Sequence, residues 1–142
     1  MLHSTRPRFL LAYLAGFFVA SNLNWAVAEI FLNPWAIPRL DGFMRMNAGG
    51  VDIARMTIGF AIPLLVAATL VATLPRPAGW AARSVWSGWI VSLAAFFGTY
   101  TFISGWGNVA WWPLMVTAVC DTVTLIAGTL LIGFLQQWRR AT

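Results

Sequence analysis

Four long apolar stretches constrain this sequence more than any other feature. They cover residues 9–32, 51–74, 84–104 and 112–135. Each is long enough to cross the hydrocarbon core of a bilayer, which takes about 20 helical residues. Short segments rich in proline and glycine separate them: Asn33-Pro34, Pro75-Arg76-Pro77 and Gly105-Trp106-Gly107. The sequence therefore predicts an all-α, polytopic membrane protein, a four-transmembrane-helix bundle that forms a single domain over residues 1–142.

Composition excludes several other classes of protein. Only 9% of the residues are charged and 60% are hydrophobic, whereas about a quarter of a soluble domain is charged. A soluble enzyme and a disordered chain are both excluded. The single cysteine, Cys120, and the single histidine, His3, offer no metal-ligating or haem-ligating cluster, so we expect no cofactor and no metal. The basic residues are scattered at the ends of the stretches, which argues against a nucleic-acid partner.

The arginines predict the orientation in the membrane. Cytoplasmic segments of membrane proteins carry an excess of basic residues. If the N-terminus is cytoplasmic, two arginines fall in outer segments, with Arg55 just inside the second stretch, and six fall in inner ones: Arg6, Arg8, Arg76, Arg83, Arg139 and Arg140. We therefore expect both termini in the cytoplasm, and a multi-pass protein of the inner (plasma) membrane of a bacterial-type cell.

Two segments allow more than one interpretation. Arg6 and Arg8 followed by an apolar run, with Ala26-Val27-Ala28 as a cleavage site, would suit a signal peptide. An uncleaved helix is favoured because the apolar stretch continues through Leu32. Residues Ala36–Asn47 carry apolar side chains at helical spacing and predict a short interfacial helix, either a surface connector or a lid.

Small residues at four-residue spacing predict the faces along which the helices approach closely. The first stretch has Ala12, Gly16, Ala20, Asn24 and Ala28 in one row. The second has Gly59, Pro63 and Ala67, and the third has Ser84, Gly88 and Ser92. These rows predict a tight bundle.

Ionisable residues in the apolar stretches are the candidate functional groups, because charge is costly in hydrocarbon. Asp121 lies about 13 Å from the outer end of the fourth stretch, where a carboxylate costs about 2.5–3.5 kcal/mol. It shares a helical face with Thr117, Thr124 and Gly128, so we expect it to point into the bundle. A carboxyl that gains and loses a proton there would suit proton-coupled transport.

The predicted binding site lies in the outer half of the bundle. Its residues could instead have a purely structural role. Arg55 is expected as the partner of Asp121 or as an anion contact, although the same pair could simply hold the helices in register. The candidate substrate- or ion-binding residues are Asp121, Arg55, Asn24, Asn22, Glu29, Asp52, Thr117 and Tyr100. No nucleophile–base pair or phosphate-binding loop is present in the sequence, so no catalytic residue is predicted.

Three functions are compatible with this pattern. The favoured one is movement of a small solute or ion, by a protein that assembles as a homo-oligomer or with other membrane subunits. The second is a non-catalytic accessory or assembly subunit of a larger membrane complex, which would suit the short loops and the many tryptophans. The third is a membrane enzyme acting on a lipid or quinone-like substrate.

Overall fold

The computed structural model describes residues 6–40, 53–75, 79–107 and 109–138. Within these ranges the chain is helical and has no strand. The helices are α1 (Arg6–Val27), α2 (Asn33–Ala36), α3 (Ile53–Thr73), α4 (Trp80–Ser92), α5 (Thr99–Trp106) and α6 (Trp111–Trp138). Two π-helical segments join helices end to end: Ala28–Leu32 lies between α1 and α2, and Leu93–Gly98 lies between α4 and α5.

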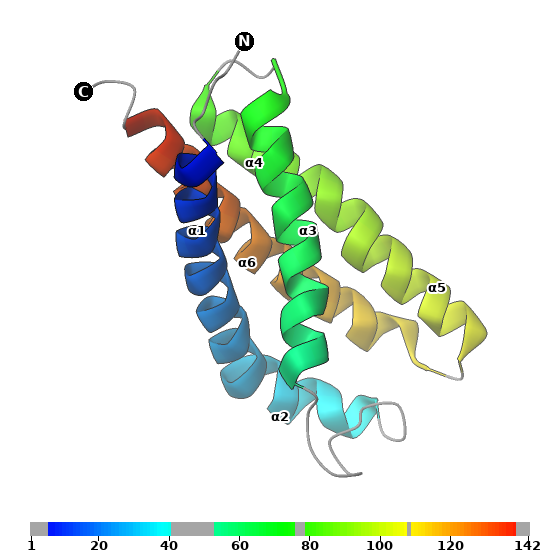
Figure 1. The fold of residues 1–142 in the computed structure, drawn as a ribbon. Coiled ribbons are helices and arrows are strands. Elements are labelled where there is room, and N and C mark those ends of the chain that lie inside the picture. The colour runs from blue at the N-terminus through cyan, green and yellow to red at the C-terminus, as the bar shows by residue number, and fades with distance from the viewer. Residues whose placement is uncertain (1–5, 41–52, 76–78, 108, 139–142) are drawn as a thin grey trace.

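Four continuous helical spans result, and each is long and apolar enough to cross a membrane. They run over Pro7–Ala36, Ile53–Thr73, Trp80–Trp106 and Trp111–Gln137. The predicted all-helical bundle of four long apolar helices is therefore confirmed. The start of α1 and the end of α6 lie at the same end of the bundle (Figure 1), which we call the terminal end.

The first span extends beyond its predicted end at Leu32. The chain remains helical through Asn33 and Pro34 to Ala36, although a proline has no N–H and its ring crowds the carbonyl four residues earlier. The π-helical segment directly before this point shifts the hydrogen bonding, so that Asn33 N–H bonds to Ala28 O. This wider turn explains how the helix accommodates Pro34.

The predicted interfacial helix over Ala36–Asn47 is described only at its start. A short 3-10 turn covers Ile37–Arg39, and the Leu40 N–H bonds to Ala36 O at 2.9 Å. Leu40 is buried and packs against Leu114 and Met115 of α6. This turn thus anchors the connection on the bundle, and the remainder of the predicted helix lies outside the described residues.

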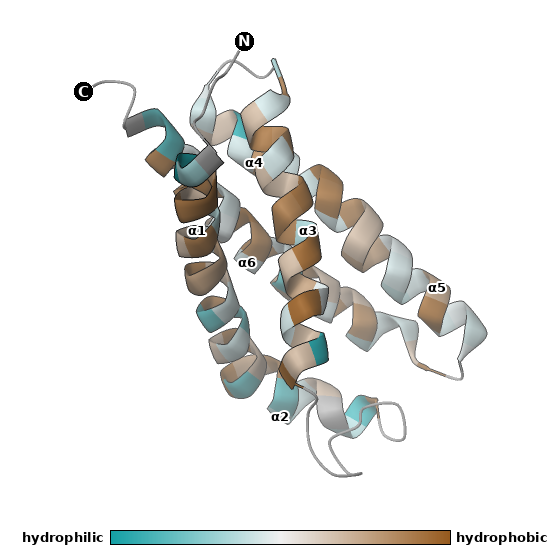
Figure 2. Cartoon of the chain, viewed as in Figure 1, coloured by the Kyte–Doolittle hydropathy of each residue, from teal (hydrophilic) through white to brown (hydrophobic). Residues whose placement is uncertain are grey.

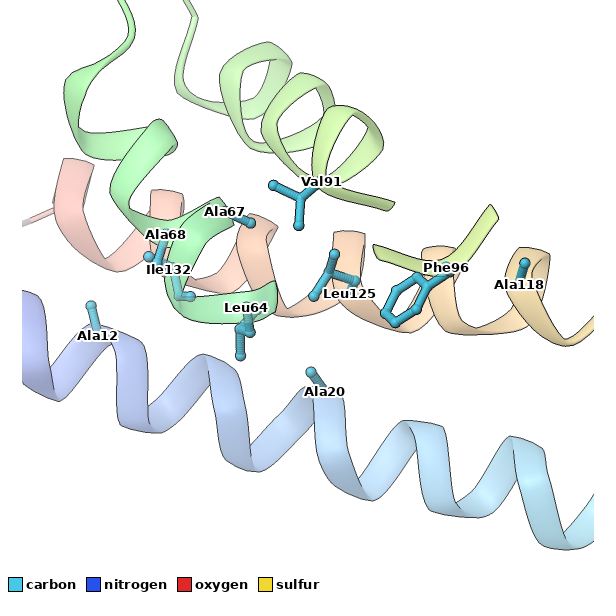
Figure 3. Packing of buried hydrophobic residues seen from close by; sticks show 10 residues of the cluster. All are labelled: Ala12, Ala20, Leu64, Ala67, Ala68, Val91, Phe96, Ala118, Leu125 and Ile132. Carbon is cyan, nitrogen blue, oxygen red and sulfur yellow. The ribbon is translucent and has the colours of Figure 1, made fainter. Parts of the chain in front are cut away.

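Helix α6 is the centre of the bundle. It contacts α1, α3, α4 and α5, and half of its most apolar stretch is buried, compared with 17–22% in the other spans. Figure 3 shows the core around it: Leu64 and Ala67 of α3 and Val91 of α4 pack beside Leu125 and Ile132 of α6. Hydrophobic residues cover most of α3, whereas the second half of α1 is more hydrophilic (Figure 2).

The α1–α6 contact depends on the absence of side chains. A Cβ at Gly128 would lie 2.8 Å from the Ala20 Cβ, and one at Gly16 would lie 2.8 Å from Gly128 O. The predicted close row on α1 is thus confirmed, with Ala12 and Ala20 buried. The row on α4 is confirmed as well, since Ser84, Gly88 and Ser92 are all buried.

Candidate functional site

Asp121 lies on α6 with its side chain only 8% exposed. Its two carboxyl oxygens accept hydrogen bonds from two other helices. The Asn24 amide of α1 donates to Oδ1 at 2.7 Å, and the Tyr100 hydroxyl of α5 donates to Oδ2 at 2.7 Å. The predicted inward orientation of Asp121 is therefore confirmed, and three helices meet at this carboxyl.

A fourth side chain, Thr124, completes this group. The Asn24 amide donates a second hydrogen bond to Thr124 Oγ1 at 3.2 Å, and the Thr124 hydroxyl donates to Asp121 O at 2.9 Å. Both amide protons of Asn24 are thereby used. We call Asp121, Asn24, Tyr100 and Thr124 the Asp121 site.

The site can accommodate its carboxyl with or without a proton. A tyrosine hydroxyl can donate to a carboxylate or accept from a carboxylic acid, whereas an amide NH₂ donates to either form. A proton added at Oδ2 thus requires only that the Tyr100 O–H rotates. Both donors are uncharged, so neither fixes a negative charge on Asp121 as an arginine would.

Both donors lie close to a π-helical segment. Ala28, where the first segment begins, is four residues after Asn24, and Gly98, where the second ends, is two residues before Tyr100. A π turn adds a residue to the helical repeat and rotates the following side chains, and such turns are frequent at functional sites. The second segment therefore helps to set the face on which Tyr100 meets Asp121.

Arg55 lies on a part of α3 that the predicted packing row does not reach, and its role as a partner of Asp121 or as an anion contact stays a prediction. It is exposed near the start of α3, and the described hydrogen-bond partners of the Asp121 carboxyl are Asn24 and Tyr100. The four-residue row that links Arg55 to Gly59 and Pro63 is buried only from Pro63 onward, and a Cβ at Gly59 would meet no atom within 4 Å. Helix α3 packs through its later turns, so this row could not be extrapolated to its start.

The structure describes three of the other candidate residues, whose predicted roles stay predictions. Asn22 is exposed and donates to Phe18 O on its own helix at 2.7 Å. Glu29 is exposed in the first π-helical segment. Thr117 is half-buried and donates to Pro113 O at 3.0 Å. Asp52 falls outside the described residues.

Sequence reasoning placed Thr124 on the face of Asp121 but did not include it among the candidates. Its spacing of three residues from Asp121 was the available signal, because such residues are neighbours on a helix surface. The contact with Asn24 depends on the pairing of α1 with α6, which no local pattern indicates.

Comparison with protein-family models, with curated proteins and with solved structures finds no match to this chain. Among the described residues, no group of three histidine, cysteine, aspartate or glutamate side chains could hold a metal ion. The chemistry of the site therefore has to be argued from its own side chains.

Proposed function

We propose that this chain is a multi-pass membrane protein that moves a small solute or ion, with Asp121 as the carboxyl that takes up and releases the coupling proton. The observation that carries this proposal is the buried Asp121 carboxyl, which receives hydrogen bonds from α1 and α5. The arginine bias favours the inner (plasma) membrane with cytoplasmic termini.

The depth of the carboxyl supports a role beyond packing. Asp121 is ten residues after Trp111 and 17 before Trp138, or about 15 Å and about 25 Å along the helix from its two ends. Ionisable residues at such depth are costly and mark substrate, ion or proton pathways in membrane proteins. A pair of hydroxyls or a single amide would join the helices at a lower free-energy cost than a buried carboxyl.

The neutral surroundings favour a proton or a cationic solute over an anion. Asn24 and Tyr100 add no positive charge to the carboxyl. A negative charge on Asp121 would repel an anion, whereas it would attract a proton or a protonated amine. The exchange of a proton for such a cation at one carboxyl is a simple way to couple their movements.

Proton movement in proteoliposomes tests this function. Vesicles loaded with a pH-sensitive dye are given a K⁺ diffusion potential, and then a panel of small amines and inorganic cations under a pH gradient. We expect the wild type to change the internal pH faster than empty vesicles under at least one condition. Asp121→Asn should abolish the difference, because the amide cannot release a proton at neutral pH.

Two asparagines on α1 provide a matched control. Asn24→Ala should alter the pH dependence of the flux because it removes a donor to Asp121. Asn22→Ala should leave it unchanged, since Asn22 bonds only to its own helix in the described structure. Proton movement equal to that of empty vesicles under every condition, with folded wild-type protein in the bilayer, would refute the proposal and favour an accessory subunit.

A further inference from the structure

The buried polar side chains of the described residues come from only two helices. They lie on α4 and α6 and are Ser84, Ser87, Ser92, Asp121, Thr122, Thr124 and Thr129. The buried side chains of α1 and α3 in the described ranges are apolar. The polar interior of the bundle is therefore concentrated at one helix pair.

Contacts between α4 and α6 show how their buried polar side chains lie relative to one another. The Thr129 hydroxyl donates to Ser84 O at 3.0 Å, and a Cβ at Gly88 would lie 2.8 Å from Ile126 Cγ1. As the residue number rises on α4 it falls on α6, so the helices are antiparallel. Ser92, one turn beyond Gly88, continues this row in the direction of Asp121.

We call this row the α4–α6 seam and define it as Ser84, Ser87, Ser92, Thr122 and Thr129. From Ser84 to Ser92 it rises eight residue steps along α4, or about 12 Å. The eight steps from Thr129 to Asp121 on α6 cover the same length. The seam thus connects the Asp121 site with the part of the bundle closer to the terminal end.

Two hydroxyls in the seam have no hydrogen-bond partner in the part of the chain that the structure describes. Ser87 Oγ and Ser92 Oγ are buried and unpaired, and both residues are wholly inaccessible. The other three seam residues have partners: Ser84 donates to Trp80 O, Thr122 to Ala118 O and Thr129 to Ser84 O. Leaving a buried hydroxyl unpaired is unfavourable, and ordered water is the usual way to satisfy one.

Unpaired polar atoms continue toward the terminal end. Arg83 Nε and Gln136 Nε2 are also buried without a hydrogen-bond partner. Gln136 is seven residues after Thr129, which places it on the same face of α6, and Arg83 is one turn before Ser87 on α4. Together these four atoms extend from the terminal end of the bundle to the turn next to Asp121.

We infer that the α4–α6 seam holds a file of water molecules that gives protons access to Asp121 from the terminal end. A proton would pass from water to hydroxyl to water, one O–H bond breaking as the next forms, and would end on the Asp121 carboxyl. The water file rests on the unpaired seam atoms alone, whereas its use as a proton route rests on the proposed function.

Cysteine accessibility tests whether the seam is hydrated. In a Cys120→Ala background, Ser87→Cys and Ser92→Cys place a thiol at each unpaired hydroxyl with little change of size. The matched control is Ile90→Cys, on the outward face of the same helix, where the side chain is 39% exposed. Membranes are treated with Ag⁺, and the remaining free thiols are counted with a maleimide after unfolding in SDS.

We expect both seam variants to react about tenfold or more faster than Ile90→Cys, because the reactive thiolate forms in water and is suppressed in an apolar environment. Equal or slower reaction at the seam would show that Ser87 and Ser92 are dry, and would overturn the inference. Labelling does not depend on flux, so its failure is distinct from failure of the proposed function.

A second variant tests the proton route. Ser92→Val fills the seam with an apolar side chain and should slow the flux that depends on Asp121, whereas Ser92→Thr, which has the shape of valine but keeps the hydroxyl, should retain it. If the seam is hydrated but Ser92→Val leaves the flux unchanged, the proton route is overturned, and only the presence of water in the seam is supported. Folding of each variant is checked by its thermal unfolding in detergent.

Discussion

Helix α6 packs against α1 and against α4 in different ways. Toward α1, Gly16, Ala20 and Gly128 bring the backbones together by removing side chains. Toward α4, the serines and threonines of the α4–α6 seam are equally small but carry hydroxyls. Van der Waals packing holds the first contact at these residues, whereas the second also has an interhelical hydrogen bond from Thr129 to Ser84 O.

This difference has a functional consequence. Around Gly16, Ala20 and Gly128 the α1 contact has no side-chain hydroxyl to bind water, whereas a hydroxyl-lined contact can hold water. Asp121 lies near both sides, because it accepts a hydrogen bond from Asn24 on α1 and is followed along α6 by Thr122 of the seam. Asp121 thus lies beside a close-packed contact on one side and near the polar side chains of the seam on the other.

The largest expected effect is on the α1 side. Gly128→Ala adds one methyl group where the Ala20 Cβ would be 2.8 Å away, and overpacking of this kind costs about 1–3 kcal/mol. The free energy of unfolding in mixed micelles measures the loss. Gly59→Ala is the control: its Cβ meets nothing within 4 Å, so we expect no loss. Equal behaviour of the two variants would contradict the tight α1–α6 contact.

An intermediate effect is expected at the Asp121 site. Asp121→Leu keeps the branched shape and removes both acceptor oxygens. A double-mutant cycle with Tyr100→Phe should show a coupling energy of about 0.5–2 kcal/mol. The control cycle uses Tyr13→Phe, whose hydroxyl donates to Ala61 O at 3.0 Å, and should show none. Coupling with Tyr13 as large as with Tyr100 would mean that the hydrogen bond at Asp121 has no specific contribution.

The smallest effect is expected in the seam. Thr129→Val preserves shape and removes the hydrogen bond to Ser84 O, so the free energy of unfolding should fall by about 0.5–1 kcal/mol. Thr69→Val on the exposed face of α3 removes only a bond to its own helix at Leu65 O and should be neutral. If Thr129→Val were neutral too, the α4 side would be held by packing alone, and the contrast between the two sides of α6 would disappear.

Local patterns predicted features that depend on one helix at a time. Small residues four apart predicted the close faces of α1 and α4, since that spacing places residues on one side of any helix. The threonines around Asp121 predicted its inward orientation. The packing row of α3 was extended incorrectly to Arg55, because the same rule carried it to a turn where no residue is buried. The extension of the first span through Pro34 was also missed, since it depends on a π turn that hydropathy does not indicate.

The sequence by itself determined that this chain forms four long apolar helices with one deeply placed carboxyl, because hydropathy and helical periodicity are properties of consecutive residues. Only the tertiary structure decided which groups meet that carboxyl. Asn24 and Tyr100 are 97 and 21 residues away from Asp121 in the chain, and their donation depends on how α1 and α5 rotate against α6. That rotation follows from packing at many contacts at once, which a spacing rule along one helix does not contain.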